Sequence, residues 1–169
     1  MLRQDPNNFW EQLERLEKLI RASELKAGVI FSFHSLILGL FVDRIMHFQE
    51  VFNESIVYLI LACLWLLSVF ISIYFCFKCF MPHMEKRYNK NVFFFKDAAS
   101  AFGNIDEFTG KLINVCTNQD ELFKQLSEQI HIESKIIDKK FDCIQKSLRF
   151  FALSFIFIIM ILVFWLLRL

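Results

Sequence analysis

Three long runs of apolar residues dominate the hydrophobicity pattern of this chain, over residues 27–42, 56–77 and 150–167. A helix needs about 20 apolar residues to cross the roughly 30 Å hydrocarbon core of a bilayer. The first run is the shortest, and it reaches that length if the side chains of Asp43 and Arg44 extend past the interface. The pattern therefore predicts an integral membrane protein with transmembrane helices over residues 27–46, 56–80 and 150–168.

The polar segment before the first run has the periodicity of an amphipathic helix. Apolar or small residues recur there at steps of three and four: Trp10, Leu13, Leu16, Ile20, Ser23 and Ala27. On the other faces, three acids each precede a base by four residues: Glu11 and Arg15, Glu14 and Lys18, Glu17 and Arg21. Asp5-Pro6 is typical of a helix start. We therefore expect one helix over residues 6–46, with an amphipathic part over 1–26.

A second amphipathic stretch leads into the third run. Its apolar face comprises Phe123, Leu126, Ile130, Ile137, Phe141, Ile144 and Leu148. Thr117 and Asp120 have the spacing of a capping box, which predicts a single helix over 118–168. Asn104 with Glu107 predicts a shorter helix, in which Ile105, Phe108, Leu112 and Val115 share one face.

The residues between these helices contain the apolar segment 92–97, which we expect to be buried where the helices meet. The predicted fold class is an all-α membrane protein with three transmembrane helices. Extensions of these helices form a cytoplasmic helical bundle, in which residues 81–149 make up a sensor region.

Composition and charge agree with this topology. The chain is 56% hydrophobic and has only 4 Gly and 2 Pro, which favours long helices over a many-stranded sheet. Basic residues number 5 in residues 1–26 and 12 in 78–149, but only 1 in 43–54. The positive-inside rule therefore predicts a cytoplasmic N-terminus, an external turn over 47–55 and an external C-terminus. The charged first 26 residues predict that there is no cleavable signal peptide.

Small and polar residues stand out within the predicted spans. Gly28, Ser32, Ser35 and Gly39 share one face of the first span, and Ser68, Ser72, Cys76 and Cys79 share one of the second. Small residues let helices approach closely in lipid, so we expect the first two spans to pack tightly, within one chain or between copies. A conduction path lined by these hydroxyls is the alternative.

His34 is the only ionisable residue at the middle depth of a span. Polar groups there are costly, and they often have a function. We expect its imidazole to form a hydrogen bond to a neighbouring helix. A proton relay is the alternative, but no partner acid is evident.

Catalytic and metal-binding patterns are absent from the sequence. It has no Gly-rich phosphate loop, no paired His ligands at helical spacing and no Gly-x-Ser-x-Gly turn, so we expect neither enzyme activity nor a cofactor. Cys76, Cys79 and His83 are one ligand short of a structural zinc site, so no metal is expected. The five cysteines are expected to be thiols in a reducing compartment. Residues 78–149 carry 12 basic and 10 acidic residues, a balance that disfavours nucleic-acid binding.

Two clusters beside the predicted spans contain groups able to hold a phosphate and a base. They are residues 23–27, and residues 129–135 followed by 139–141. These clusters resemble motifs of the transmembrane effector family of Pycsar antiphage systems. In that family, Ala-Asp-x-Lys-Ala precedes the first span and Gln-Ile-x-x-x-Ser-Lys-Ile precedes the last, and residues 94–97 stand where the family has Phe-Phe/Gly-Asp. The family also has a Lys-Tyr pair before the last span, for which Lys140 and Phe141 stand here. Ser23 and Glu24 depart from the family's Ala-Asp, and Phe141 departs from the Tyr of that pair.

The resemblance implies an oligomeric effector of the bacterial inner membrane. A cyclic pyrimidine mononucleotide (cyclic CMP or cyclic UMP) from a partner cyclase would activate it. Damage to the membrane would then stop the growth of the infected cell or kill it before the phage spreads. The implied ligand-binding residues are Glu24, Lys26, Asp97, Gln129, Ser134, Lys135 and Lys140. Two alternatives stay open: a constitutive small channel or transporter subunit without nucleotide input, and a scaffold that recruits a soluble partner to the membrane.

Overall fold

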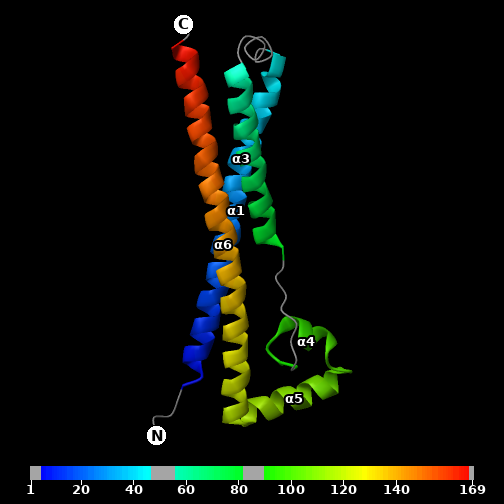
Figure 1. The fold of residues 1–169 in the computed structure, drawn as a ribbon. Coiled ribbons are helices and arrows are strands. Elements are labelled where there is room, and N and C mark those ends of the chain that lie inside the picture. The colour runs from blue at the N-terminus through cyan, green and yellow to red at the C-terminus, as the bar shows by residue number, and fades with distance from the viewer. Residues whose placement is uncertain (1–4, 47–55, 82–89, 168–169) are drawn as a thin grey trace. The chain divides into compact units, whose positions relative to one another are not determined.

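The computed structural model describes residues 5–46, 56–81 and 90–167, and every regular element within these residues is helical. The helices are α1 (Asn7–Asp43), α3 (Ile56–Phe80), α4 (Phe95–Ser100), α5 (Ile105–Thr117) and α6 (Gln119–Leu166) (Figure 1). The predicted all-α class is confirmed. The external turn predicted at 47–55 lies outside the described residues.

Three of these helices, α1, α3 and α6, are long and apolar enough to cross a membrane. Many large apolar side chains on them are exposed, including Leu36, Leu40, Phe70, Ile156 and Leu162. So many exposed large apolar side chains are unusual for a soluble monomer and are expected on helices in lipid. The chain is therefore a membrane protein.

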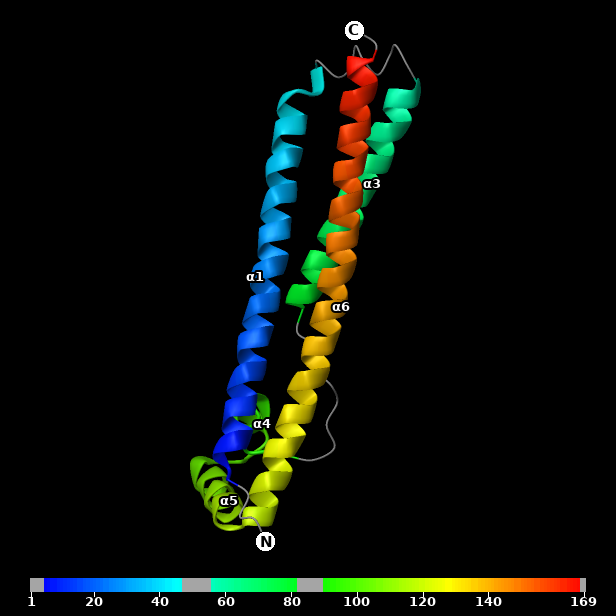
Figure 2. The same cartoon turned by 90° about the vertical axis from the view of Figure 1, so that its left-hand side faces the viewer.

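The chain divides into two compact units. The first unit consists of Met1–Arg21 and His83–Asp138, and the second of Ala22–Pro82 and Lys139–Leu169. Helices α1 and α6 contribute residues to both units, and neither is broken at the boundary, as the continuous ribbon of α6 shows (Figure 2). The predicted long helices over 6–46 and 118–168 are confirmed to within a few residues at each end.

The core of the second unit is formed where α1, α3 and α6 meet. It contains Ala27, Ile30, Cys76, Cys79, Cys143 and Ile144, with Phe31 and Phe151 packed against them. Hydroxyl groups join α3 to α6 within this unit: Ser72 Oγ donates to the Ser147 carbonyl oxygen at 2.9 Å. Both serines are fully buried, so these hydroxyls are satisfied by the helices themselves.

The core of the first unit gathers residues from the predicted apolar faces. Leu16, Val115 and Leu126 are buried, and Phe9 packs on Phe123 with ring centroids 5.1 Å apart. Val92 is also buried, because the segment before α4 lies against the other elements of this unit.

Four residues predicted to face inward are exposed instead: Trp10 (44%), Phe95 (70%), Ile105 (72%) and Leu148 (52%). Phe95 and Ile105 are the first residues of α4 and α5, so too little of either helix precedes them to cover their side chains. At Leu148 the buried position is taken by its neighbour Ser147.

The helix starts show one correct and one wrong prediction. Asn104 caps α5: its Oδ1 accepts the Glu107 N–H at 2.8 Å, while Glu107 Oε2 accepts the Gly103 N–H at 2.9 Å. The start of α6 is capped by Asn118, whose Oδ1 accepts the N–H groups of Asp120 and Glu121. Thr117 was the wrong choice, because it is still the last residue of α5 and its hydroxyl donates to Ile113.

Candidate functional site

The predicted ligand-binding residues fall into both units. Glu24, Lys26 and Lys140 belong to the second unit, and Asp97, Gln129, Ser134 and Lys135 belong to the first.

Lys140 holds together three helices of the second unit. Its side chain is only 4% exposed, and its Nζ donates to Glu24 Oε1 at 2.8 Å and to the Cys79 carbonyl oxygen at 2.6 Å. The last carbonyl groups of a helix lack partners within the helix, and a positive charge at that end is favourable. Lys140 of α6 therefore caps α3 while it pairs with α1. We call Lys140, Glu24 and Cys79 the lysine junction.

Lys26 lies close to this junction in the sequence but makes a different contact. Its Nζ lies 5.9 Å from the centroid of the Phe141 ring, within the range of a cation–π interaction. The Lys26 side chain is exposed, so its ammonium group is accessible to an anion. Phe141, which stands where the family has Tyr, thus contacts Lys26 through its ring.

Asp97 has a structural role in the first unit. Its Oδ2 accepts the Asn91 N–H at 2.9 Å. The Asn91 amide donates to the Gln125 carbonyl oxygen at 2.8 Å, and Gln125 Oε1 accepts the Val92 N–H at 3.1 Å. Asn91 and Gln125 are almost fully buried, and this network fixes the segment before α4 to α6. Sequence reasoning missed both residues, because neither belongs to a periodic apolar face.

Gln129 lines a cavity that lies wholly within the first unit. It is 7% exposed, and its Nε2 donates to Glu133 Oε1 at 2.8 Å. The cavity has a volume of about 310 Å³ and is lined by Trp10, Leu13, Glu14, Glu17, Phe93, Gln129 and Glu133. Ser134 and Lys135 are exposed on other faces of α6 and do not line it.

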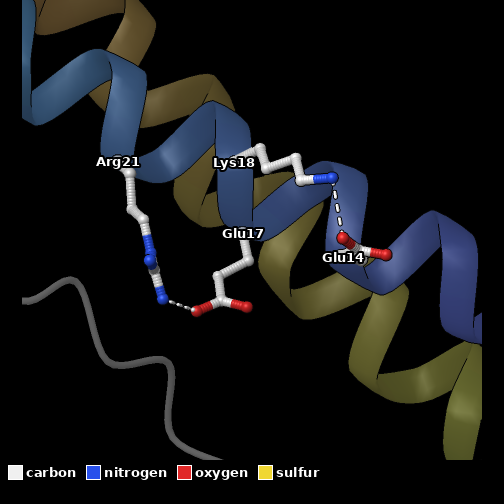
Figure 3. A network of polar contacts seen from close by, with 4 residues as sticks. All are labelled: Glu14, Glu17, Lys18 and Arg21. Atoms are coloured by element: carbon white, nitrogen blue, oxygen red, sulfur yellow. Dashed lines mark hydrogen bonds and ion pairs between the residues drawn. The ribbon is translucent and has the colours of Figure 1, made fainter.

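The two lining glutamates of α1 are each paired with a base one turn further on. Glu14 pairs with Lys18 at 2.7 Å, and Glu17 pairs with Arg21 (Figure 3). These two predicted pairs are confirmed. The hydrogen bond from Lys18 and its charge hold the pKa of the Glu14 carboxyl below its usual value, so Glu14 is ionised at neutral pH.

His34 is fully buried in the second unit. Neither ring nitrogen has a hydrogen-bond partner within the described residues, and the ring packs edge-on against Phe151 at a centroid distance of 4.9 Å. The predicted hydrogen bond to a neighbouring helix is therefore wrong for this arrangement, because the group that reaches the imidazole is an aromatic ring.

Three of the four small residues of the first span, Ser32, Ser35 and Gly39, are exposed, and Gly28 is half-buried. Ser32 and Ser35 are exposed and donate to carbonyl oxygens of their own helix, at 2.9 and 3.0 Å. A Cβ at Gly39 would meet no atom within 4 Å, whereas one at Gly28 would lie 3.9 Å from the Phe80 ring. On α3, Ser68 donates to Leu64 of its own helix, while Ser72 packs against α6. Packing of the α1 stripe against a second copy stays a prediction.

The metal prediction is only partly addressed by the described residues. They contain no cluster of three or more His, Cys, Asp or Glu side chains able to hold a metal ion. His83 lies outside them.

Comparisons with known proteins identify the family. No curated protein and no solved structure gives a significant match to this chain. A family model of the Pycsar effector protein domain matches residues 8–167, which is all of the chain except its first seven and last two residues. The chain therefore belongs to the Pycsar effector family, and this membership implies a role as an effector in antiphage defence.

Proposed function

We propose that this protein is a membrane effector that a cyclic pyrimidine mononucleotide activates to impair the bacterial inner membrane. Family membership implies a cyclic nucleotide signal made by a partner cyclase. The observation that carries the proposal is the continuity of α1 and α6. Each is one helix that starts in the first unit and continues into an apolar segment long enough to span a membrane.

The first unit is the proposed sensor. The larger number of basic residues in 1–26 and 78–149 than in 43–54 supports a cytoplasmic position for this unit, where the nucleotide is made, and an external C-terminus. Gln129, which the family motif implies as a ligand residue, lines a cavity in this unit. Lys26, Asp97, Ser134 and Lys135 are proposed as further ligand residues on the family motifs alone.

The lysine junction is the proposed latch of the resting state. Lys140 is almost fully buried while Glu24 is 41% exposed, so loss of Glu24 would leave a buried charge without its partner, which typically costs about 3–5 kcal/mol. An effector that damages membranes has to stay inactive without its signal. Shifting the ratio of active to inactive protein from 1:99 to 99:1 requires the ligand to bind the active state about 5.5 kcal/mol more favourably than the inactive state. The junction supplies part of that difference, and an anion that competes with Glu24 for Lys140 weakens it.

The active form is proposed to be an oligomer. The stripe of Gly28, Ser32, Ser35 and Gly39, of which all but Gly28 are exposed, is the surface on which a second copy packs, since small residues allow close helix contact in lipid.

The test is to express the chain in bacteria and to supply cyclic CMP or cyclic UMP while a dye reports membrane potential. We expect depolarisation only when one of the nucleotides is present, and we expect Lys135→Ala to insert normally but to lose the response. Depolarisation without any nucleotide would identify a constitutive channel. No depolarisation under any condition would favour a scaffold.

A further inference from the structure

We infer that the cavity of the first unit binds the base of the activating nucleotide and selects cytosine over uracil. The inference rests on the proposed function and adds the location and preference of its ligand site. The cavity lies between the start of α1, the segment before α4, and α6.

The cavity has the walls that a small planar ring needs. Trp10 and Phe93 form one side of it, with their ring centroids 5.2 Å apart and their planes nearly perpendicular. Two perpendicular rings offer a ligand one aromatic face and one aromatic edge, and stacking of a base on an aromatic side chain is favourable whatever the base. The aromatic side chains therefore contribute affinity for any base, and the polar groups determine which base binds more tightly.

The polar lining is rich in hydrogen-bond acceptors. Glu14, Glu17 and Glu133 contribute carboxylates, which only accept when ionised. Gln129 is the one amide in the lining, and its Nε2 already donates to Glu133. The lining therefore matches a ligand whose ring edge carries N–H donors.

The two pyrimidines differ on this ring edge at C4 and at N3, where cytosine has an acceptor and uracil an N–H donor, and the inference turns on C4. Cytosine carries an amino group on C4, which donates, while uracil carries a carbonyl oxygen there, which accepts. A carboxylate accepting from the cytosine amino group is an established pairing. A uracil carbonyl at the same place would face a carboxylate with no proton between them, and such a mismatch is strongly discriminating.

The negative charge of the ligand is compatible with this lining. A cyclic phosphate diester carries one negative charge, and the carboxylates of Glu14 and Glu17 are compensated by Lys18 and Arg21 (Figure 3). Both cations are exposed, so they can face a phosphate group while the base occupies the cavity.

The experiment measures binding of cyclic CMP and of cyclic UMP to the full-length protein in detergent by calorimetry. We expect cyclic CMP to bind at least 10-fold more tightly. Glu133→Gln, which puts an amide donor in place of an acceptor, should reduce this preference by 10-fold or more. Glu11→Gln is the matched control, because Glu11 is exposed on α1 and does not line the cavity, and it should leave the preference unchanged. Glu14→Gln is the second test variant and serves if Glu133→Gln does not fold.

The outcomes separate this inference from the proposed function. Equal affinities, or tighter binding of cyclic UMP, would overturn the cytosine preference and leave the proposed function standing. A cyclic CMP preference that survives in every folded cavity variant would overturn the location. If neither nucleotide binds, both the inference and the proposed function are overturned.

Discussion

Lys140 is the residue whose environment says most about how the resting state is held. Its ammonium group has two partners on two other helices and almost no exposure to solvent. A buried cation in this position stabilises only the arrangement that supplies both partners, so it distinguishes one packing of α1, α3 and α6 from others.

Replacing Lys140 with Met should release the resting state. The side chain keeps most of its length, but the Cys79 carbonyl loses its donor, and a buried polar group left without a partner costs about 1–3 kcal/mol. Glu24 also loses its partner, but its side chain is 41% exposed and can be hydrated, so this loss adds little. We expect membrane depolarisation in cells that have no cyclic nucleotide. Lys124→Met, at an exposed position of α6, is the control. A Lys140→Met protein that inserts normally but causes no depolarisation without nucleotide would argue against the latch.

His34 should be a destabilising residue. A buried polar group without a hydrogen bond costs about 1–3 kcal/mol, and both imidazole nitrogens are in this state. We therefore expect His34→Leu to raise the melting temperature of the purified protein in detergent, while His131→Leu at an exposed position of α6 leaves it unchanged. A lower melting temperature for His34→Leu would show that the imidazole contributes to stability.

At the scale of residues, the sequence predicted contacts within one helix but not contacts between residues far apart in the chain. The i,i+4 pairs of α1 were predictable, because both partners lie on one helix whose geometry is known in advance. The partners of Lys140 were not, since Glu24 is 116 residues away and Cys79 is 61 residues away. The network of Asn91 and Gln125 was missed for the same reason, with 34 residues between its members.

At the scale of the elements, the unbroken course of α1 and α6 is the central feature. Periodicity and hydropathy predicted it well, because a helix of that length needs only a continuous pattern without Pro. The helix starts were harder: Asn118 and Thr117 are adjacent and both are cap-forming residues, and the end of α5 decides between them.

A break in α1 should uncouple the nucleotide from the membrane. Ala22 is exposed and begins the second unit's part of α1, so a proline there meets no packed neighbour but removes a backbone hydrogen bond, at a cost of about 3 kcal/mol. We expect Ala22→Pro to bind nucleotide with unchanged affinity and to lose depolarisation. Ala22→Ser is the control. Full depolarisation by the proline variant would mean that α1 does not carry the signal.

At the scale of the whole molecule, the class of protein followed from length and hydropathy alone, because lipid imposes a minimum number of apolar residues on any spanning helix. The division into two units was less predictable. Two of its three boundaries, at residues 21–22 and 138–139, fall inside continuous helices, where periodicity gives no sign of a division.

Assembly is the prediction that belongs to this scale. Gly39→Leu adds a side chain where the protomer itself offers open space, so the single chain should fold as before. If a second copy packs on this stripe, the added bulk should reduce chemical cross-linking between copies in the membrane by several-fold. Leu67→Ile, on an exposed face of α3, is the matched control. Unchanged cross-linking in Gly39→Leu would remove the stripe from the interface.

The most direct measurement uses purified protein in lipid vesicles loaded with a fluorescent dye. Cyclic nucleotide is added to the wild type and to Ala22→Pro, and both binding and dye release are recorded. The account predicts that both proteins bind the nucleotide and that only the wild type releases dye. Release from both proteins, or binding by the wild type without release, would contradict the account.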